Sequence, residues 1–273
     1  MQLCICKGSS RVTHMLHRFL PEMPSGEISI ALRGGVHVVS RLSDYNGLIL
    51  FLFGTPERSV VEACCMLSDA GDTFLDVGAN NGAVGMLVRR VVGPELHLVF
   101  VEPQRDLAGA IRKSATACGF AADVHAIAIS DCSGEERFHV TPTHTGTGRI
   151  GEGEASVRCE TMRSILDGLP DTPIGAKVDV EGAERHVLPS LCSDPRFAFC
   201  VVESQSEAAR QLIMDVAHAS KHVVYGIERS LLSWRLRKAQ NEEELGDVVD
   251  AAIINTERVQ DRPILNKWHR LKI

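Results

Sequence analysis

The sequence lacks the features that would place the protein in a membrane or in a disulfide-rich secreted class. The longest apolar run, Leu48–Phe53, has the length of a strand and is far too short to cross a bilayer. Residues 1–18 show no signal-like apolar stretch, because Lys7, Arg11 and His14 interrupt their hydrophobic residues. The nine cysteines lack the two spaced pairs of a structural zinc site. We therefore expect a soluble, cytoplasmic protein with no membrane partner and no structural metal.

Positive charge is also scarce. The chain has 29 Lys and Arg against 35 Asp and Glu, a net charge of -6. A general nucleic-acid-binding protein needs a basic face, so no nucleic-acid partner is expected. The two local basic runs, 235–238 and 267–270, are interpreted as solvated helix faces. A length of 273 residues suffices for one large α/β domain with a cleft for a small ligand.

Three segments are expected along the chain. Residues 1–70 form an N-terminal extension with a hairpin around the turn 33–35 and a helix that begins near Glu57. Within it the apolar run 48–53 is interpreted as β-structure. Such an extension could contribute to an acceptor pocket or build a homodimer. Residues 71–260 form the main domain, and 261–273 a tail.

In the main domain, apolar runs of strand length alternate with segments of helix length. The expected strands are Thr73–Val77, Leu96–Val101, Val124–Ile129, Ala176–Val180, Phe197–Val202, His222–Ile227 and Val248–Ile254. Helices are expected over 83–92, 107–118, 161–169 and 207–219, and a basic one over 229–238. Short, nearly continuous apolar strands separated by helices are typical of a parallel sheet covered on both faces. The pattern predicts a doubly wound α/β fold with a seven-stranded sheet.

A glycine-rich turn follows the first of these strands, in the segment 74–85. Ligands of open α/β sheets bind beyond the carboxyl ends of the strands, and Gly78 and Gly82 leave room for one there. A dinucleotide fingerprint would require glycine where this chain has Asn80. Asp76 would repel a pyrophosphate, whereas it suits a ligand with an ammonium group. The turn therefore favours a nucleoside ligand that carries positive charge.

The next two strands end in residues that suit the rest of such a ligand. Glu102, before Pro103, can accept hydrogen bonds from both ribose hydroxyls. The edge Ala128–Ser130 offers small and branched apolar groups followed by a hydroxyl, which could hold an adenine ring.

Four blocks carry a resemblance to a known family. They are Asp76-Val77-Gly78-Ala79-Asn80-Asn81-Gly82, Val101-Glu102-Pro103, Ala128-Ile129-Ser130-Asp131-Cys132-Ser133-Gly134 and Lys177-Val178-Asp179-Val180-Glu181-Gly182-Ala183-Glu184. Together they resemble the class I S-adenosylmethionine-dependent methyltransferases and, among these, the FkbM family. The resemblance implies S-adenosylmethionine as cofactor and a Rossmann-like sheet with an antiparallel final strand. One departure is visible: Ser204-Gln205-Ser206 stands where the family often has a histidine.

The resemblance also implies where the cofactor would bind. The contacts map to Asp76, Gly78, Ala79, Asn80, Gly82, Glu102, Pro103, Ala128, Ile129, Ser130 and Asp179. Members of the family typically methylate a hydroxyl oxygen of a small molecule or sugar.

Methyl transfer to an alcohol is helped by a base that removes the hydroxyl proton. Asp179 and Glu181 have the strand period of two, so their side chains are expected on one side of the sheet edge, where repulsion could raise one pKa. His144, in the polar loop 141–153, is a third candidate. Two alternatives stay open. Glu181 and Glu184 could cap backbone amides at a helix start or pair with Lys177 or Arg185. Alternatively, Asp179, Glu181 and Glu203 could hold a divalent ion that orients a diol.

These observations predict an S-adenosylmethionine-dependent O-methyltransferase that acts on a small molecule or sugar. Two other readings remain: a nicotinamide-dependent oxidoreductase, and a protein that binds the cofactor without catalysis. The basic segment 229–238 hints at an acidic or phosphorylated acceptor.

Overall fold

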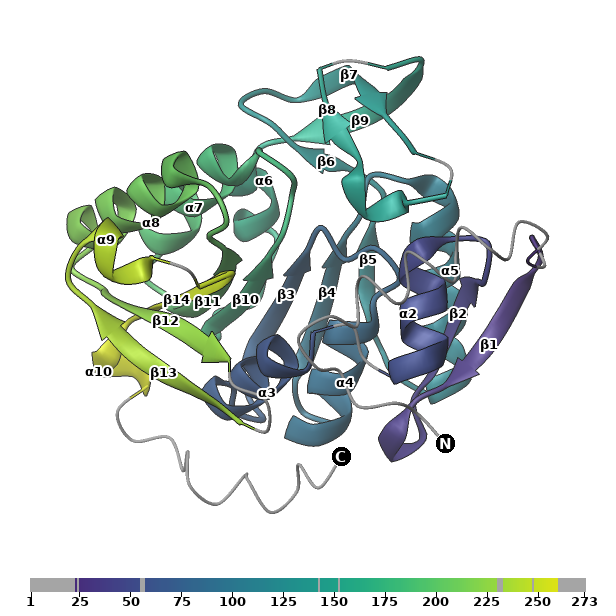
Figure 1. The fold of residues 1–273 in the computed structure, drawn as a ribbon, viewed down its shortest axis with the longest axis horizontal. Helices are drawn as coiled ribbons and strands as arrows, with labels where there is room; N and C mark the ends of the chain where they lie inside the picture. The colour runs from purple at the N-terminus through teal and green to yellow at the C-terminus, as the bar shows by residue number, and fades with distance from the viewer. Residues whose placement is uncertain are drawn as a thin grey trace.

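The computed structural model describes residues 23, 25–54, 57–141, 143–151, 153–229, 233–246 and 248–259. The expectations for residues 1–18, for the basic run 267–270 and for the tail 261–273 lie outside the described residues. Within the described part, the centre of the molecule is an eight-stranded sheet with the order β13-β12-β14-β11-β10-β3-β4-β5 (Figure 1). Its strands are β3 (Thr73–Val77), β4 (His97–Val101), β5 (Asp123–His125), β10 (Ile174–Val178), β11 (Phe197–Glu203), β12 (Val223–Arg229), β13 (Trp234–Ala239) and β14 (Asp250–Ile254).

Helices cover both faces of this sheet, and each face has its own hydrophobic core. One face carries α3 (Arg58–Leu67), α4 (Ala83–Val92), α5 (Arg105–Cys118) and the short α10 (Thr256–Val259). The other carries α6 (Met162–Asp167), α7 (Glu184–Cys192), α8 (Glu207–Ala219) and α9 (Glu242–Leu245). Because β3, β10 and β14 are buried along their whole length, their apolar residues do not alternate with polar ones. This is the doubly wound α/β arrangement that the sequence predicted.

The direction of the strands follows the expected methyltransferase fold. The neighbours β11-β10-β3-β4-β5 are parallel, whereas β14 runs antiparallel to both β11 and β12. The reversed final strand is therefore confirmed. The sheet has eight strands instead of seven because β13 adds to its edge, antiparallel to β12.

The basic segment 229–238 was wrongly predicted as a helix, since most of it belongs to the strands β12 and β13. The period of two is visible in hindsight, because Trp234 and Leu236 pack against the core while Arg235 and Arg237 alternate with them. Both arginines form ion pairs with Glu228 across the hairpin. The single carboxylate of Glu228 offsets part of the positive charge, and the helix on which the hint of an acidic acceptor rested is not present in the described part of this segment.

The expected strand Val124–Ile129 is divided between two sheets. Its first part is β5 of the main sheet, and its last part, β6 (Ala128–Ile129), starts a small second sheet. The small sheet has the order β6-β9-β7-β8, with β7 (Gly134–His139), β8 (Arg149–Ile150) and β9 (Ala155–Glu160). It stands above the carboxyl ends of β3 and β4 (Figure 1). The chain leaves the main sheet at the point where a ligand site was expected.

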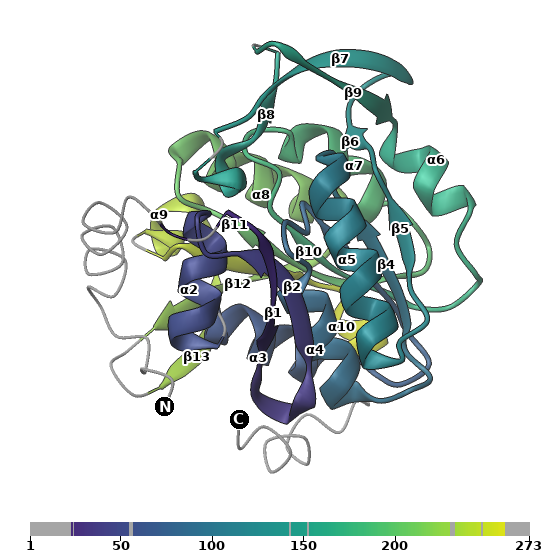
Figure 2. The same ribbon diagram turned by 90° about the vertical axis from the view of Figure 1, so that its right-hand side faces the viewer.

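The N-terminal extension contains the predicted hairpin, β1 (Glu27–Ala31) with β2 (His37–Arg41), which packs on α5 (Figure 2). The apolar run Leu48–Phe53 was wrongly predicted as β-structure and lies in the helix α2 (Tyr45–Phe53). Asp44 caps this helix by accepting a hydrogen bond from the Gly47 N–H, and Gly54 ends it in a left-handed conformation. No described helix is long and apolar enough to span a membrane.

Candidate functional site

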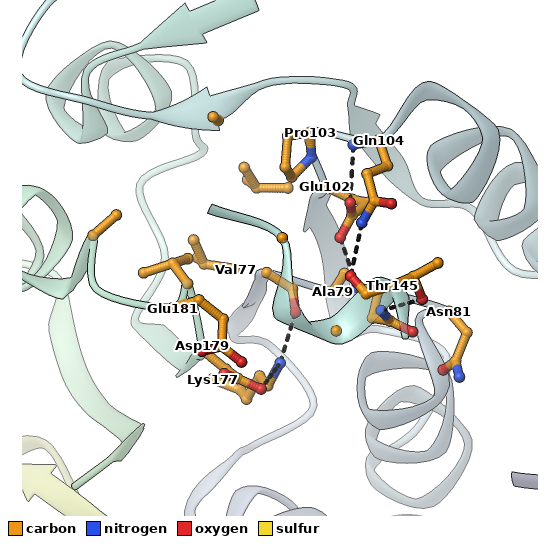
Figure 3. A pocket seen from close by; sticks show the side chains of 18 of the residues that line it. Val77, Ala79, Asn81, Glu102, Pro103, Gln104, Thr145, Lys177, Asp179 and Glu181 are labelled. Atoms are coloured by element: carbon orange, nitrogen blue, oxygen red, sulfur yellow. Dashed lines mark hydrogen bonds and ion pairs between the residues drawn. The ribbon is translucent and has the colours of Figure 1, made fainter. Parts of the chain in front are cut away.

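A cavity of about 210 Å³ lies at the carboxyl ends of β3, β4 and β10, beneath the small sheet (Figure 3). Ten of the predicted site residues line it: Gly78, Ala79, Asn80, Glu102, Pro103, Ala128, Ile129, His144, Asp179 and Glu181. Three predicted cofactor residues, Asp76, Gly82 and Ser130, lie outside its wall. The structure thus brings together parts of the chain that are about a hundred residues apart.

The glycine turn forms the floor of the cavity. The N–H groups of Gly78 and Ala79 donate to the Val101 carbonyl at 2.9 and 3.1 Å, which fixes the turn against the end of β4. Gly78 has a φ of +73°, and a Cβ atom there would lie 1.7 Å from the carbonyl oxygen of Asp179. Only glycine therefore fits at this position. Gly82 has a φ of +75° and serves to start α4, which explains its place outside the wall.

Asp76 does not reach the cavity as the sequence suggested. Its side chain is fully buried; one carboxylate oxygen accepts from the Gly85 N–H at 2.9 Å, and the other lies 3.6 Å from the Lys177 ammonium. Burial raises the pKa of Asp76, and the charge of Lys177 opposes that rise. Asp76 therefore anchors the start of α4 to the buried lysine.

Lys177 makes contacts in the structure that were not predicted from the sequence. Its ammonium donates to the Gly78 carbonyl at 2.7 Å and lies 3.3 Å from the Asp179 carboxylate. Burial by itself would lower the pKa of Lys177, but Asp179 and Asp76 outweigh it and hold that pKa above its usual range. In the parallel ladder Lys177 is the direct partner of Asp76. Aligning the segments Leu75–Val77 and Ala176–Val178 as neighbours would have shown this pair.

Glu102 projects into the cavity from the end of β4 and is only 3% exposed. Its two oxygens accept hydrogen bonds from the N–H groups of Asn80 and Gln104, both at 2.9 Å. Burial raises the pKa of Glu102 to about 7, although these N–H donors oppose the rise. The carboxylate is thus held in one orientation and keeps lone pairs for a ligand.

An apolar patch adjoins Glu102. Ile127, Ala128 and Ile129 line the cavity together with Pro103 and Phe138. The Ser130 hydroxyl instead donates to Glu136 at 2.5 Å, which takes it away from the cavity. The expected apolar edge for an adenine ring is therefore present, but the Ser130 hydroxyl is not part of it.

The opposite end of the cavity is acidic. Asp179, Glu181, Glu203 and Glu57 line it, and of these only Glu57 was not named as a candidate contact in the sequence. Burial, followed by the charges of Asp179 and Glu181, raises the pKa of Glu203 to about 7. Burial also raises the pKa of Glu57 to about 8, against the opposing charge of Lys177. Carboxylates from three separate elements thus share one small space.

The period-of-two argument for Asp179 and Glu181 is wrong, because β10 ends at Val178 and both residues lie in the following turn. Glu181 is exposed and has a φ of +50°, while Asp179 contacts Lys177. Burial and the charge of Asp179 raise the pKa of Glu181. Glu184, the first residue of α7, accepts from the Gly182 N–H at 3.2 Å, but the N-cap residue Ala183 provides no side-chain cap for the helix.

The divalent-ion alternative finds no support in the geometry. Among the described residues, the three metal-ligating side chains whose ligand atoms lie within 4.8 Å of one another are Asp131, Cys132 and Glu136, on the small sheet. Asp179, Glu181 and Glu203 do not form such a group.

Comparisons with known proteins add little beyond the fold. No family model matches the chain, so no family model supports the resemblance to the FkbM family. No curated protein matches the chain either. Among solved structures, a SAM-dependent methyltransferase from Agrobacterium tumefaciens is 10% identical with a TM-score of 0.45, over 86% of this chain and 72% of that one. A precorrin-6y C5,15-methyltransferase from Geobacter metallireducens is 13% identical with a TM-score of 0.43, over 72% and 86%.

An O-methyltransferase from Streptomyces achromogenes involved in tomaymycin synthesis is also 13% identical, with a TM-score of 0.42, over 73% of this chain and 80% of that one. Such distant likenesses decide nothing about activity. The class I methyltransferase fold of this chain is read from the order and direction of its strands.

Proposed function

We propose that the protein is an S-adenosylmethionine-dependent methyltransferase that transfers a methyl group to a hydroxyl oxygen of a small molecule or sugar. The observation that carries the proposal is the excess of carboxyl groups over cationic groups in the cavity. Among its described lining residues, Glu57, Glu102, Asp179, Glu181 and Glu203 face a single cation, Lys177, which is already engaged by Asp76 and Asp179. Such a cavity favours a sulfonium with an ammonium group and repels the pyrophosphate of a nicotinamide dinucleotide.

The residues present fit that cofactor. Glu102 offers acceptors for ribose hydroxyls beside the apolar patch of Pro103 and Ala128, which suits an adenine ring. The side-chain oxygen of Asn80 is buried and has no hydrogen-bond partner among the described residues, so it can accept a hydrogen bond from a ligand. The turn 179–181 contacts the glycine turn at Gly78. It brings Asp179 and Glu181 to the cavity, where their carboxyl groups suit the positive charge of the cofactor.

A hydroxyl acceptor is supported by the resemblance of the block 177–184 to the FkbM signature and by the acids beside it. The cofactor supplies a methyl group already activated on sulfur, so the protein has to align the acceptor, exclude water and remove one proton. When bound, the cofactor would supply this methyl group to the acceptor oxygen and would keep the electron pair of the broken carbon–sulfur bond on its sulfur. The hydroxyl proton passes to a carboxylate of this chain.

Glu203 is the best-placed proton acceptor. It lines the cavity at the end of β11, is partly buried, and receives a hydrogen bond from the Gln205 side-chain amide. Its pKa of about 7 suits a base at neutral pH. Asp179 is a weaker candidate because its carboxylate is already paired with the Lys177 ammonium at 3.3 Å. Glu181 and His144 also line the cavity and stay predictions for the same role.

Calorimetric titration with S-adenosylhomocysteine and, separately, with NADH tests the proposal directly. We expect micromolar binding of S-adenosylhomocysteine and no binding of NADH. The reverse result would establish the oxidoreductase alternative. A labelled-methyl assay on extracts of the source organism, followed by mass spectrometry, then identifies the acceptor. Binding of the cofactor product without any methylated compound would support the non-catalytic alternative.

A further inference from the structure

Thr145 lies at the centre of a hydrogen-bond network over the cavity (Figure 3). It begins the 3-10 turn Thr145–Thr147, in the polar loop that carries the candidate base His144. Its hydroxyl accepts from the Asn80 side-chain amide at 3.0 Å, and its carbonyl accepts from the Gln104 side-chain amide at 3.0 Å. One residue therefore joins the glycine turn to the turn after β4.

Asn80 and Gln104, whose side chains donate to Thr145, also donate hydrogen bonds to Glu102. The backbone N–H groups of Asn80 and Gln104 each donate to one oxygen of the Glu102 carboxylate at 2.9 Å. Their side chains meet again at Thr145, so the hydrogen bonds close a ring around the buried acid. A shift of Thr145 would move both donors and so change the orientation of the carboxylate.

The N-terminal extension fixes Thr145 from the other side. The Thr145 N–H donates to one oxygen of Asp44 at 2.8 Å, while the other oxygen accepts from Gly47 at the start of α2. Asp44 is 6% exposed, and next to it the Tyr45 N–H donates to the Thr143 carbonyl at 2.9 Å. The same carboxylate thus caps a helix and anchors the loop.

We infer that Thr145 is a positioning residue for the cofactor, and that Asp44 of the N-terminal extension sets its place. This inference rests on the proposed function, because Glu102 is the group proposed to bind the ribose. It assigns the extension to the cofactor end of the site, where the sequence analysis offered an acceptor pocket or a homodimer. A carboxylate fixed before the ligand arrives loses less freedom on binding, so affinity depends on the ring being intact.

The test compares three variants by calorimetric titration with S-adenosylhomocysteine. Thr145→Val removes the hydroxyl while preserving shape, and we expect about tenfold weaker binding. Thr145→Ser keeps the hydroxyl and should bind within about twofold of the wild type. Thr147→Val is the matched control, because the Thr147 hydroxyl bonds only within the loop, to His144 and Thr141, among the contacts described. It should also stay within about twofold.

Amide hydrogen exchange without ligand gives a second readout. Thr145→Val and Asp44→Asn should speed exchange at the N–H groups of Asn80 and Gln104, and Thr147→Val should not. Wild-type affinity in Thr145→Val, or an equal loss in Thr147→Val, would overturn the inference. If the wild type itself fails to bind S-adenosylhomocysteine, the proposed function fails instead, and unchanged exchange in Thr145→Val would separately show that the ring does not order these amides.

Discussion

The two ends of the cavity hold carboxylates in opposite ways. At one end Glu102 is almost fully buried, and two backbone N–H groups fix both of its oxygens. At the other end Glu203 and Glu57 lie near Asp179 and the pKa of each is raised in part by that neighbouring negative charge. The first arrangement suits an acid that binds and does not move. The second suits acids that exchange a proton or meet a cation.

The two ends also differ in how they are built. The Glu102 end is formed mainly by two turns within residues 78–104, the glycine turn and the turn after β4, which hydrogen bonds join to each other. The acidic end gathers residues from the start of α3, from the turn after β10 and from the end of β11 around Lys177. We therefore expect the acidic end to depend on its single lysine.

Lys177→Met tests that dependence and should have the largest effect. It leaves Asp76 buried without its cation and frees the Gly78 carbonyl, which should cost about 3–5 kcal/mol of unfolding free energy. Urea denaturation measures the loss. Lys113→Met, at an exposed ion pair with Glu27, should cost less than about 1 kcal/mol. Equal unfolding midpoints in the two variants would show that the buried lysine does not hold the site together.

Glu203→Gln asks whether the acidic end performs chemistry. Methyl transfer should fall by about 10²–10⁴-fold while S-adenosylhomocysteine binding remains. In the wild type the rate should rise with pH through about 7, because the base must be ionised, and the variant should lose that rise. Glu207→Gln, at the exposed start of α8, is the control. An equal loss in Glu181→Gln with an unchanged pH profile in Glu203→Gln would move the role to Glu181.

Glu102→Gln addresses the fixed end. An amide can replace only one of the two acceptor oxygens, so S-adenosylhomocysteine should bind about 10- to 100-fold more weakly, about 1.4–2.7 kcal/mol. Turnover at saturating cofactor should change much less. Calorimetric titration against the exposed control Glu95→Gln measures the difference. An unchanged affinity would mean that Glu102 serves only to order the turns.

The last prediction concerns the stability of the ligand-free protein as a function of pH. The pKa values of Glu57, Glu102, Glu203 and Asp250 are raised to about 8, 7, 7 and 6, mainly by burial. Between pH 5 and 8 the folded state therefore binds more protons than the unfolded state, so stability falls as pH rises. Tm should therefore fall steadily as the pH is raised over this range. A Tm that climbs instead would contradict the raised pKa values at both ends.

Much of the fold was predictable because a buried strand or helix requires a recognisable pattern of apolar residues within its own segment. Thr73–Val77, Ala83–Val92 and Glu207–Ala219 have the predicted bounds, since each is a strongly apolar or amphipathic segment between clear turn signals. The run 48–53 failed because a short apolar stretch suits a strand and a buried helix equally well. Its capping signals, Asp44 and Gly54, were present but outweighed by hydrophobicity.

The site was predictable only where it is local. Gly78, Asn80 and Glu102 follow strand ends that can be read one at a time, and all three line the cavity. The role of Lys177 depends on which strand neighbours β10 and in what register, which no single segment reveals. Thr145 and Glu57 come from a loop and a helix start with no motif, and only the closed fold brings them to the cavity.

Gly78 carries a consequence for engineering. The Asp179 carbonyl excludes a Cβ atom at residue 78, so the two turns are in direct main-chain contact there, and no choice of side chain at residue 78 can widen the gap between them. A redesign for bulkier acceptors would therefore have to vary lining residues elsewhere, such as Asn46 or Ile150, and keep this contact as a fixed spacer.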